Sequence, residues 1–439
     1  MSRRKSTFRV IITGFFSLII TGTILLSMPF ATVSGTRAPF LDALFTSTSA
    51  ACVTGLIVYD TAAYWSLFGQ LVILILIQIG GLGIITVATY CLIISRQKIG
   101  LFQRIAMQDQ ISAPKVGGII RFTKFFIETT FVIEAVGALL LFPSFLKYHE
   151  TGRALFYSVF HSVSAFCNAG FDVAGTEGRF ASLSAYAGDA GINLVIIVLI
   201  VVGGLGFLTW YDLVHVRFRI KAASVQTKMI LAGTCILIAV PFLYFFFYEF
   251  RSVPLNDRFI VALFQTVTPR TAGFSTVDYA TVSESGLLIT TALMLIGGAP
   301  GSTAGGMKVT TIFILAISSY SFLVRKDNVN CFKRRVKSDN IRNAVCLFTM
   351  YLLLLFTGSV IMSCVEGLPA LSTLFECASA LGTVGLTTGI TPQLSSISKV
   401  MLILFMFLGR VGGVTIAYAI VSPIKHDLSR LPSENIALG

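Results

Sequence analysis

Charged residues are scarce in this sequence. Asp, Glu, Lys and Arg make up 12% of the 439 residues, whereas hydrophobic residues make up 55%. Soluble domains carry about 25% charged residues, so a water-soluble chain of this length could not cover its surface with so few. A mean hydropathy of +0.84 fits a chain whose solvent is largely lipid. The composition excludes a soluble enzyme and predicts an all-α polytopic membrane protein.

Motifs for catalysis and for tightly bound metals are also missing. The eight cysteines form no C-x-x-C pair, which argues against a disulfide framework or a zinc site. No nucleophile with a nearby base occurs at a workable spacing, and Gly305-Gly306-Met307-Lys308 lacks the ending of a phosphate-binding loop. We therefore expect no enzyme activity and no organic cofactor.

The net charge of +13 is unevenly distributed. Basic residues gather beside long apolar runs, within 3–9, 96–124, 217–228, 325–342 and 425–430. Because basic loops stay on the cytoplasmic side of a membrane, the pattern predicts cytoplasmic loops and cytoplasmic N- and C-termini. Binding of a polyanion is the alternative explanation for these basic residues, but membrane topology is the one that we prefer. The apolar run after Arg9 is longer than the core of a signal peptide, so we interpret it as a retained first helix.

Four passages share one pattern of residues. Each begins with Phe, continues through small and hydroxyl residues, and ends in glycine followed by Leu or Phe; the passages are 45–56, 160–171, 264–274 and 375–386. Their glycines are Gly55, Gly170, Gly273 and Gly385. The third passage is one residue shorter between its Phe and its glycine. A fourfold internal repeat organises the chain.

Two apolar segments long enough to cross a bilayer flank each passage. The pairs are 9–30 and 68–95, 119–143 and 191–214, 226–248 and 286–324, and 341–364 and 398–422. The passages are too short to cross, and both their ends lie on the outer side, so each dips into the membrane and returns. We predict eight transmembrane helices in four helix–pore loop–helix repeats, 1–98, 99–218, 219–335 and 336–439, with pore loops at about 38–58, 153–175, 258–278 and 368–390.

Four re-entrant loops imply a shared axis, because irregular backbone at membrane depth is tolerated only inside protein or along a water-filled path. Backbone carbonyls replace the hydration shell of a cation without trapping it by a full charge, and glycine allows the conformations that aim carbonyls inward. Ordinary turns are the alternative, which the fourfold recurrence disfavours. The predicted ion-binding selectivity filter comprises Cys52, Val53, Thr54, Gly55, Cys167, Asn168, Ala169, Gly170, Thr271, Ala272, Gly273, Thr383, Val384 and Gly385.

The apolar segment 286–324 is interrupted by small residues near its middle. Neither apolar half spans a bilayer comfortably, so we predict one helix broken inside the membrane, a feature that marks functional sites in transporters. A hairpin outside the membrane is the alternative. The break lies below the third loop and would act as a gate; its residues are Gly297, Gly298, Gly301, Ser302, Thr303, Gly305, Gly306 and Lys308.

Two arginines fall at membrane depth. Arg410 lies within the last apolar segment, where an unpaired cation is costly; facing the pore, it would oppose cation passage and hold the gate through carbonyls and hydroxyls. A buried arginine satisfied by neighbouring helices is the alternative. Arg270 is predicted to be a structural brace paired with Glu376 or Asp278. The glycines of IGGLG and VGGLG, at 79–83 and 202–206, are expected to allow close helix packing, with a hinge as second interpretation.

The motifs ACVTG, FCNAG, RTAG and GTVG, each between two helices, resemble the Ktr/Trk superfamily of bacterial potassium transporters, most closely its KtrB branch. The resemblance covers nearly the whole chain. It implies a K⁺-channel-like pseudo-tetramer that transports K⁺, often with Na⁺ as an activator, works as a homodimer in the bacterial cell membrane, and is controlled by a separate cytosolic nucleotide-binding ring of RCK domains. In that family the broken segment corresponds to an intramembrane gate, and a basic residue stands at the place of Arg410.

An ion-coupled secondary transporter, a K⁺/Na⁺ or K⁺/H⁺ symporter, is the main alternative. Such transporters usually have inverted repeats and membrane carboxylates, whereas these repeats run in one direction and only Glu128 and Glu134 fall within the spans. Compared with the TVGYG sequence of K⁺ channels, the loops keep one glycine in common, which predicts looser K⁺/Na⁺ discrimination. The basic loops 96–124 and 325–342 and the tail 425–439 are expected to dock the cytosolic subunit.

Overall fold

The computed structural model describes residues 2–95, 100, 103–105, 107–108, 118–175 and 182–412, with side chains from Arg9 onward. The predicted C-terminal tail, the end of the last predicted span and most of the basic stretch 96–117 lie outside the described residues.

Each repeat contributes a long first helix, a short inner helix and a second helix. The first helices are α1 (Ser2–Leu26), α7 (Ile119–Phe145), α11 (Val225–Tyr244) with the π-helical turn η4 (Phe245–Glu249), and α15 (Ser338–Glu366). The inner helices are α2 (Phe40–Ala51), α8 (Thr151–Cys167), α12 (Leu255–Val267) and α16 (Ala370–Gly382). The second helices are α4 (Leu67–Leu82) with α5 (Ile84–Ile94), α9 (Ala190–Gly204) with α10 (Phe207–His215), α13 (Glu284–Leu295) with α14 (Val309–Leu323), and α17 (Ser396–Val411).

Short elements join these helices. They are α3 (Thr61–Tyr64), the 3₁₀ turns η1 (Pro29–Ala31), η2 (Ser184–Tyr186), η3 (Ile220–Ala222) and η5 (Thr391–Gln393), and the antiparallel strands β1 (Asn330–Cys331) and β2 (Arg334–Arg335). The predicted boundary 218/219 falls between α10 and α11, and the boundary 335/336 falls between β2 and α15.

The four first helices are long and apolar enough to cross a membrane. Within the described residues these candidate spans are Arg9–Leu26, Ile119–Phe145, Val225–Glu249 and Ser338–Glu366, and there are up to six if each of two bent helix pairs is one span. All four predicted first helices are therefore found, while the predicted total of eight stays a prediction.

Two apolar segments expected to be single spans are sharply bent. α4 and α5 meet at 91°, and α9 and α10 meet at 87°. The bends lie at Gly83 and Gly206, whose φ values of 84° and 81° are in the region that favours glycine. Gly83 and Gly206 thus match the second interpretation of these motifs, a hinge. Gly80 and Gly203 match the first, because a Cβ on either would collide with a backbone carbonyl of the neighbouring inner helix.

Proline marks where three inner helices begin. Pro39, Pro254 and Pro369 occupy the N-cap positions of α2, α12 and α16, with φ between −52° and −56°. A proline has no N–H to donate, so it suits the start of a helix, where that N–H would have no partner within the helix. The inner helices are therefore separated from the long helices before them.

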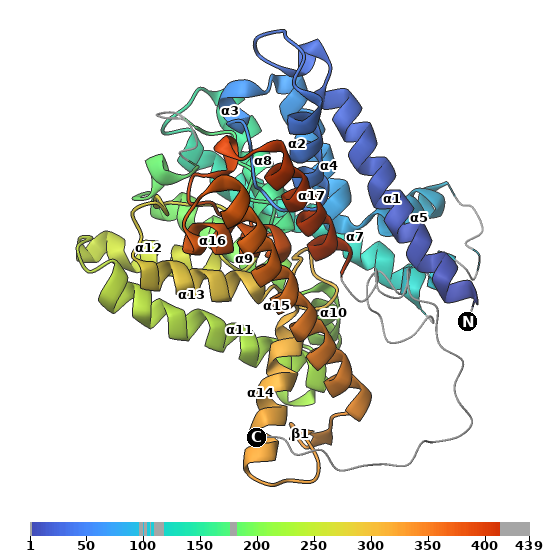
Figure 1. Ribbon diagram of the computed structural model, residues 1–439. Helices are drawn as coiled ribbons and strands as arrows, with labels where there is room; N and C mark the ends of the chain where they lie inside the picture. Colours follow the sequence, from blue (N-terminus) through green and yellow to red (C-terminus); the bar gives the residue numbers. More distant parts are fainter. Residues whose placement is uncertain are drawn as a thin grey trace.

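The repeats are arranged in a closed ring. Each second helix packs against the inner helix of the next repeat: α4 contacts α8, α9 contacts α12, α13 contacts α16, and α17 returns to α2. Lys399 of α17 forms an ion pair with Asp42 of α2 (2.8 Å), and Tyr59 donates to the same carboxylate (2.9 Å). Figure 1 shows α17, near the end of the described chain, beside α2 from the first repeat in the upper part of the molecule. The first and last quarters of the chain thus meet.

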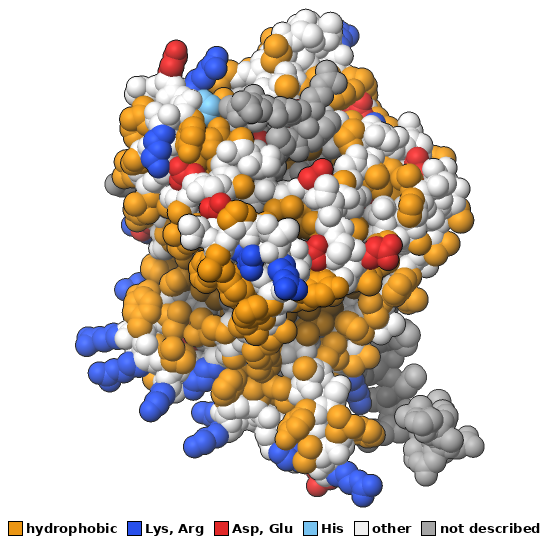
Figure 2. All heavy atoms as spheres, turned by 90° about the vertical axis from the view of Figure 1, so that its left-hand side faces the viewer, with side chains coloured by type: hydrophobic (Ala, Val, Ile, Leu, Met, Phe, Trp, Pro, Cys, Tyr) orange, Lys and Arg blue, Asp and Glu red, His pale blue; other side chains and the backbone are white. Residues whose placement is uncertain are grey.

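Opposite charges gather at opposite ends of the molecule. Figure 2 shows most Asp and Glu side chains in the upper part, many Lys and Arg side chains in the lower part, and hydrophobic side chains throughout the zone between. Large apolar side chains on the first helices are exposed, including Val132 (62%) and Leu139 (72%) on α7. An outward apolar surface between two charged ends is the pattern of a membrane protein.

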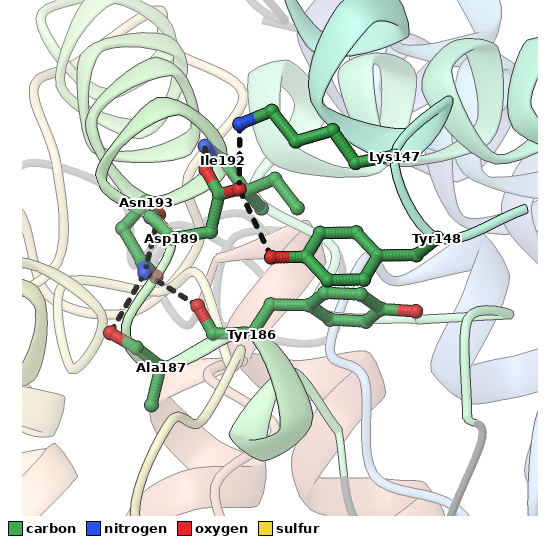
Figure 3. Close-up of polar contacts among 7 residues, drawn as sticks. All are labelled: Lys147, Tyr148, Tyr186, Ala187, Asp189, Ile192 and Asn193. Carbon is green, nitrogen blue, oxygen red and sulfur yellow. Dashed lines mark hydrogen bonds and ion pairs between the residues drawn. The ribbon is translucent and has the colours of Figure 1, made fainter.

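A polar cluster at the start of α9 joins α9 to the end of α7 (Figure 3). The Asp189 carboxylate, 5% exposed, accepts from Lys147 Nζ (3.1 Å), the Tyr148 hydroxyl (3.3 Å) and the Ile192 N–H (3.1 Å). Burial acts to raise the pKa of Asp189, but the Ile192 N–H and the Lys147 ammonium together hold that pKa below its usual value. The cluster is an N-cap and an ion pair combined.

Candidate functional site

The four loops that follow the inner helices have the same backbone conformation. In each loop the motif glycine has a positive φ, and so does the residue two positions before it. The values are 57° and 90° for Val53 and Gly55, 59° and 68° for Asn168 and Gly170, 69° and 81° for Thr271 and Gly273, and 51° and 97° for Thr383 and Gly385. A positive φ is an outlier for the β-branched residues Val and Thr, so the surrounding structure must impose it at Val53, Thr271 and Thr383.

The loops face one another in a ring. A Cβ atom built on Gly55 would come closer than 3.0 Å to the carbonyl oxygen of Ala169. The same clash would occur between Gly170 and Ala272, between Gly273 and Val384, and between Gly385 and Thr54. Each glycine therefore touches the next loop in chain order, and the fourth touches the first. Only glycine fits where four backbones come this close.

The shorter third loop reaches the same conformation by ending its inner helix earlier. α12 ends at Val267, six residues before Gly273, whereas α8 and α16 end three residues before their glycines. Pro269 cannot donate a helical hydrogen bond, and the turn through Arg270 connects the helix to Thr271. The missing residue is thus absorbed at the end of the helix and leaves the loop unchanged.

A buried hydroxyl supports each loop from the end of its inner helix. The N–H groups of Gly55 and Gly385 donate to Ser49 Oγ and Ser379 Oγ, both at 3.0 Å. In the other two loops the hydroxyl is the donor: Ser164 to the carbonyl of Phe171 (2.8 Å), and Thr268 to that of Phe274. The sequence analysis did not single out these residues, although a Ser six positions before the glycine recurs in three passages.

The predicted gate segment lies against the loops and the helix bends. Its backbone donates from Ala299 to Gly204 (2.8 Å) and from Gly306 to Gly409 (3.2 Å), and it accepts at Gly301 from Phe207 (3.0 Å). The Thr303 hydroxyl donates to the carbonyl of Phe166 at the end of α8 (3.0 Å). A Cβ on Gly305 would collide with Thr383, the first residue of the fourth loop. The segment therefore bridges repeats two, three and four directly below the ring.

Arg410 connects the gate segment to the first repeat. Its guanidinium donates to the carbonyl oxygens of Thr303, Gly80 and Gly81, the last at 3.0 Å. None of the ion pairs between described residues involves Arg410. Backbone carbonyls therefore accept the N–H groups of its guanidinium, and no carboxylate neutralises its positive charge. Aligning LGRVG with IGGLG and VGGLG places Arg410 where the other repeats have Gly81 and Gly204.

Lys308 adds a second cation to the gate segment. Its Nζ donates to the carbonyls of Ala304 (2.6 Å) and Gly305 (3.4 Å). Its contacts lie within the segment, whereas those of Arg410 join separate repeats. The remaining predicted gate glycines act through the backbone: Gly297 donates to Met307 (2.7 Å), and Gly298 accepts from Val309 (3.1 Å).

The partner expected for Arg270 requires correction. Arg270 is buried and donates to the Thr234 hydroxyl of α11 (3.2 Å), not to a carboxylate. Glu376 instead accepts from Thr388 N–H (3.2 Å) and the Thr391 hydroxyl (3.0 Å) just beyond the fourth loop. Asp278 accepts from the N–H of Ala280 (2.9 Å). Arg270 turns outward to the first helix of its own repeat, so it lies behind the ring.

Glu134 is a buried carboxylate that contacts the end of α8, just before the second loop. It accepts from Gln78 Nε2 (3.0 Å) and from the Cys167 thiol (3.8 Å), which precedes Asn168. Glu128 is exposed and pairs with Lys124 (3.7 Å). The described residues contain no group of three His, Cys, Asp or Glu side chains able to hold a metal ion.

Comparison with known proteins agrees with this architecture. The profile of the TrkH family, described as a cation transport protein, matches residues 2–427. The chain belongs to this family. Potassium/sodium uptake protein NtpJ of Enterococcus hirae is 36% identical over 448 residues, covering 100% of this chain and 98% of NtpJ. Ktr system potassium uptake protein B of Bacillus subtilis is 37% identical over 437 residues, covering 98% and 96%.

The fold of this TrkH-family chain also matches a solved structure. The crystal structure of the potassium transporter TrkH from Vibrio parahaemolyticus superimposes with a TM-score of 0.75 and 21% identity, covering 95% of this chain and 85% of that one. The resemblance to the Ktr/Trk superfamily and the helical pseudo-tetrameric fold are confirmed, and the family is one of cation transport proteins, not enzymes. The roles of individual loop and gate residues stay predictions.

Proposed function

We propose that this chain is the K⁺-translocating membrane subunit of a K⁺ uptake system in the bacterial cell membrane. K⁺ would pass through a filter formed by the backbone carbonyls of the four loops. The observation that carries the proposal is the ring of glycines, each in contact with the next loop. Carbonyl rings replace the hydration shell of K⁺. The full-length relatives, named as potassium and potassium/sodium uptake proteins, supply the ion.

The segment 297–308 together with Arg410 would gate this path. The hydrogen bonds of Arg410 to Thr303 and Gly81 tie the segment below the ring. A positive charge at that place opposes the passage of a cation, because few mobile ions screen it there. Opening would require these bonds to be released, and ligands that bias the release would regulate transport.

Partners and orientation follow from the same family. We infer a homodimer, with cytoplasmic termini and with a separate cytosolic ring of nucleotide-binding RCK domains docked on the basic end. The basic residues of the β1–β2 hairpin, including Arg334 and Arg335, are exposed there. The Ktr system named for the Bacillus subtilis relative supports a regulatory subunit, and the name of NtpJ supports Na⁺ as an activator.

Growth of a K⁺-uptake-deficient bacterium on low K⁺ tests the proposal. The unchanged chain should restore growth, and Gly→Ser changes at Gly55, Gly170, Gly273 and Gly385 should each abolish rescue at equal membrane abundance. Gly152→Ala is a matched control, because nothing lies within 4 Å of the added Cβ. Full rescue by all four serine variants would contradict the filter.

Flux measurements in purified vesicles separate the proposed pathway from a symporter. Passive K⁺ flux that follows the K⁺ gradient alone is expected. A fixed, saturable stoichiometry with Na⁺ or H⁺ would favour the symporter instead. Adding Na⁺ at constant K⁺ gradient tests activation, and co-purification with retained nucleotide regulation tests the cytosolic subunit.

A further inference from the structure

A basic cavity lies outside the ring, where the end of α5 meets the start of α7. Its volume is about 420 Å³. Three cationic side chains line it: Arg104, Arg121 and Lys124. Its apolar wall is formed by Ile93 of α5 and by Ile119 and Ile120 of α7. None of these residues takes part in the filter or the gate.

The charges around this cavity favour an anion. No acidic residue lies in the first turn of α7, and its N-cap residue, Gly118, makes no side-chain capping bond. The N–H groups at a helix N-terminus carry partial positive charge and bind phosphate readily. Glu128 pairs with Lys124 at 3.7 Å, and both side chains are more than half exposed, so Glu128 offsets one of the three positive charges and the lining stays net positive.

The apolar wall distinguishes a lipid from a free ion. α7 continues from the cavity as a candidate membrane span, Ile119–Phe145, and a span that begins at Ile119 would put the cavity where lipid headgroups meet acyl chains. A phosphodiester would contact the cations and the helix N-terminus, while an acyl chain would lie on the isoleucines. We propose that this cavity binds the headgroup of an anionic phospholipid such as phosphatidylglycerol.

Lipid binding to the purified full-length chain tests this site directly. Native mass spectrometry in detergent would compare retention of phosphatidylglycerol with that of phosphatidylcholine. Each Lys or Arg near an anionic headgroup contributes about fivefold in affinity, so the triple variant Arg104→Gln, Arg121→Gln, Lys124→Gln should bind phosphatidylglycerol about a hundredfold more weakly. Phosphatidylcholine retention should not change.

A matched triple variant removes the same charge elsewhere at the basic end. Arg217→Gln, Arg219→Gln, Lys221→Gln changes the exposed connection between α10 and α11 and should retain phosphatidylglycerol. Equal loss in both triple variants would show diffuse surface attraction and overturn the site. If the first triple variant does not fold, Arg121→Gln should weaken binding about fivefold and Arg121→Lys should restore it; equal binding by both would also overturn it.

Inorganic phosphate separates the two sources of a phosphate group. We expect millimolar phosphate to leave phosphatidylglycerol bound. Displacement by phosphate, with the same dependence on the three cations, would identify a free-anion site and overturn the lipid assignment. This readout does not involve K⁺ flux, so its failure would leave the proposed transport function standing.

Discussion

The four loops that follow the inner helices are alike, whereas the second helices that run beneath them differ from one repeat to the next. All four loops place positive φ at the glycine and two residues before it. Below them, the second helix bends at Gly83 in repeat one and at Gly206 in repeat two, and is interrupted over residues 296–308 in repeat three. In repeat four it carries Arg410, two residues before Gly412, which shares the positive φ of Gly83 and Gly206.

The contrast follows from where each element lies relative to the axis. A loop that touches both neighbours cannot change its backbone without displacing the ring, so all four positions have the same steric limits. The second helices beneath the loops contact different neighbours, so their sequences and shapes can differ between repeats. We infer that the shared loops serve the common task of ion coordination, while the divergent helices carry control.

Breaking the ring at one loop should have the largest effect. Gly273→Ala adds a Cβ closer than 3.0 Å to the carbonyl oxygen of Val384 and imposes a left-handed conformation on alanine. Overpacking costs about 1–3 kcal/mol and the left-handed backbone about 1–2 kcal/mol more. K⁺ uptake measured with a radioactive tracer should fall at least tenfold, with Gly152→Ala unchanged. K⁺ uptake close to that of the unchanged chain would show that the four loops need not share one backbone conformation.

Making the second helix of repeat four resemble those of repeats one and two should have the next largest effect. Here K⁺ flux should rise instead of fall. Arg410→Gly restores the glycine found at Gly81 and Gly204, and removes hydrogen bonds to Thr303, Gly80 and Gly81. Charged hydrogen bonds contribute about 1.5–3 kcal/mol each, so the gate segment should open more often. We expect K⁺ flux in vesicles to rise several-fold.

Two controls sharpen the test of Arg410. Arg410→Lys keeps the positive charge, but its single ammonium group cannot reach all three carbonyls as the planar guanidinium does. We expect an intermediate K⁺ flux. Arg219→Gln, an exposed change between α10 and α11, should leave flux unaltered. Unchanged flux and unchanged regulation in Arg410→Gly would remove this residue from the mechanism.

The hydroxyls behind the loops should give smaller effects that differ between pairs of repeats. Ser379→Ala leaves the N–H of Gly385 without its acceptor, whereas Ser164→Ala leaves the carbonyl of Phe171 without a donor. A buried unsatisfied group costs about 1–3 kcal/mol, and an orphaned N–H is tolerated less often than a carbonyl. Reversal potentials should show a greater loss of K⁺/Na⁺ discrimination for Ser379→Ala. Ser379→Thr keeps the hydroxyl and should stay close to the unchanged chain; equal losses in Ser379→Ala and Ser164→Ala would contradict this ranking.

The repeat pattern predicted the ring because its residues are fixed by local packing. The Phe that opens each passage, such as Phe45 or Phe375, is fully buried, and the glycine is the only residue that its neighbour allows. The same passages recur at similar spacing, so the fourfold architecture and the first helices could be predicted from the sequence.

Contacts between repeats could not be predicted in the same way. Arg270 and Glu376 have opposite charges and lie in neighbouring repeats, yet Arg270 contacts Thr234 and Glu376 contacts Thr391. The direction of a side chain at the end of a helix depends on which residue of the helix faces the axis, and charge alone does not fix it. The bends at Gly83 and Gly206 were only the second interpretation for a similar reason. The sequence does not show whether a glycine allows close helix packing or bends the helix.

A change in the polar cluster of Figure 3 tests whether contacts away from the ring affect the stability of the fold without affecting K⁺ transport. The pKa of Asp189 is held below its usual value in the folded chain, so its carboxylate stabilises the fold above the pKa of the unfolded chain, about 4. That stabilisation is lost as the pH falls through the lower, folded pKa. Asp189→Asn should therefore lower the thermal unfolding midpoint in detergent at pH 7 by a few degrees, and the difference from the unchanged chain should shrink toward pH 3. K⁺ flux at pH 7 should remain the same, since the side-chain hydrogen bonds of Asp189 go to Lys147, Tyr148 and Ile192, and none of these is a described loop or gate residue. A pH-independent difference would instead assign the effect to the geometry of the hydrogen bonds that Asp189 accepts from the Tyr148 hydroxyl and the Ile192 N–H, and not to its charge.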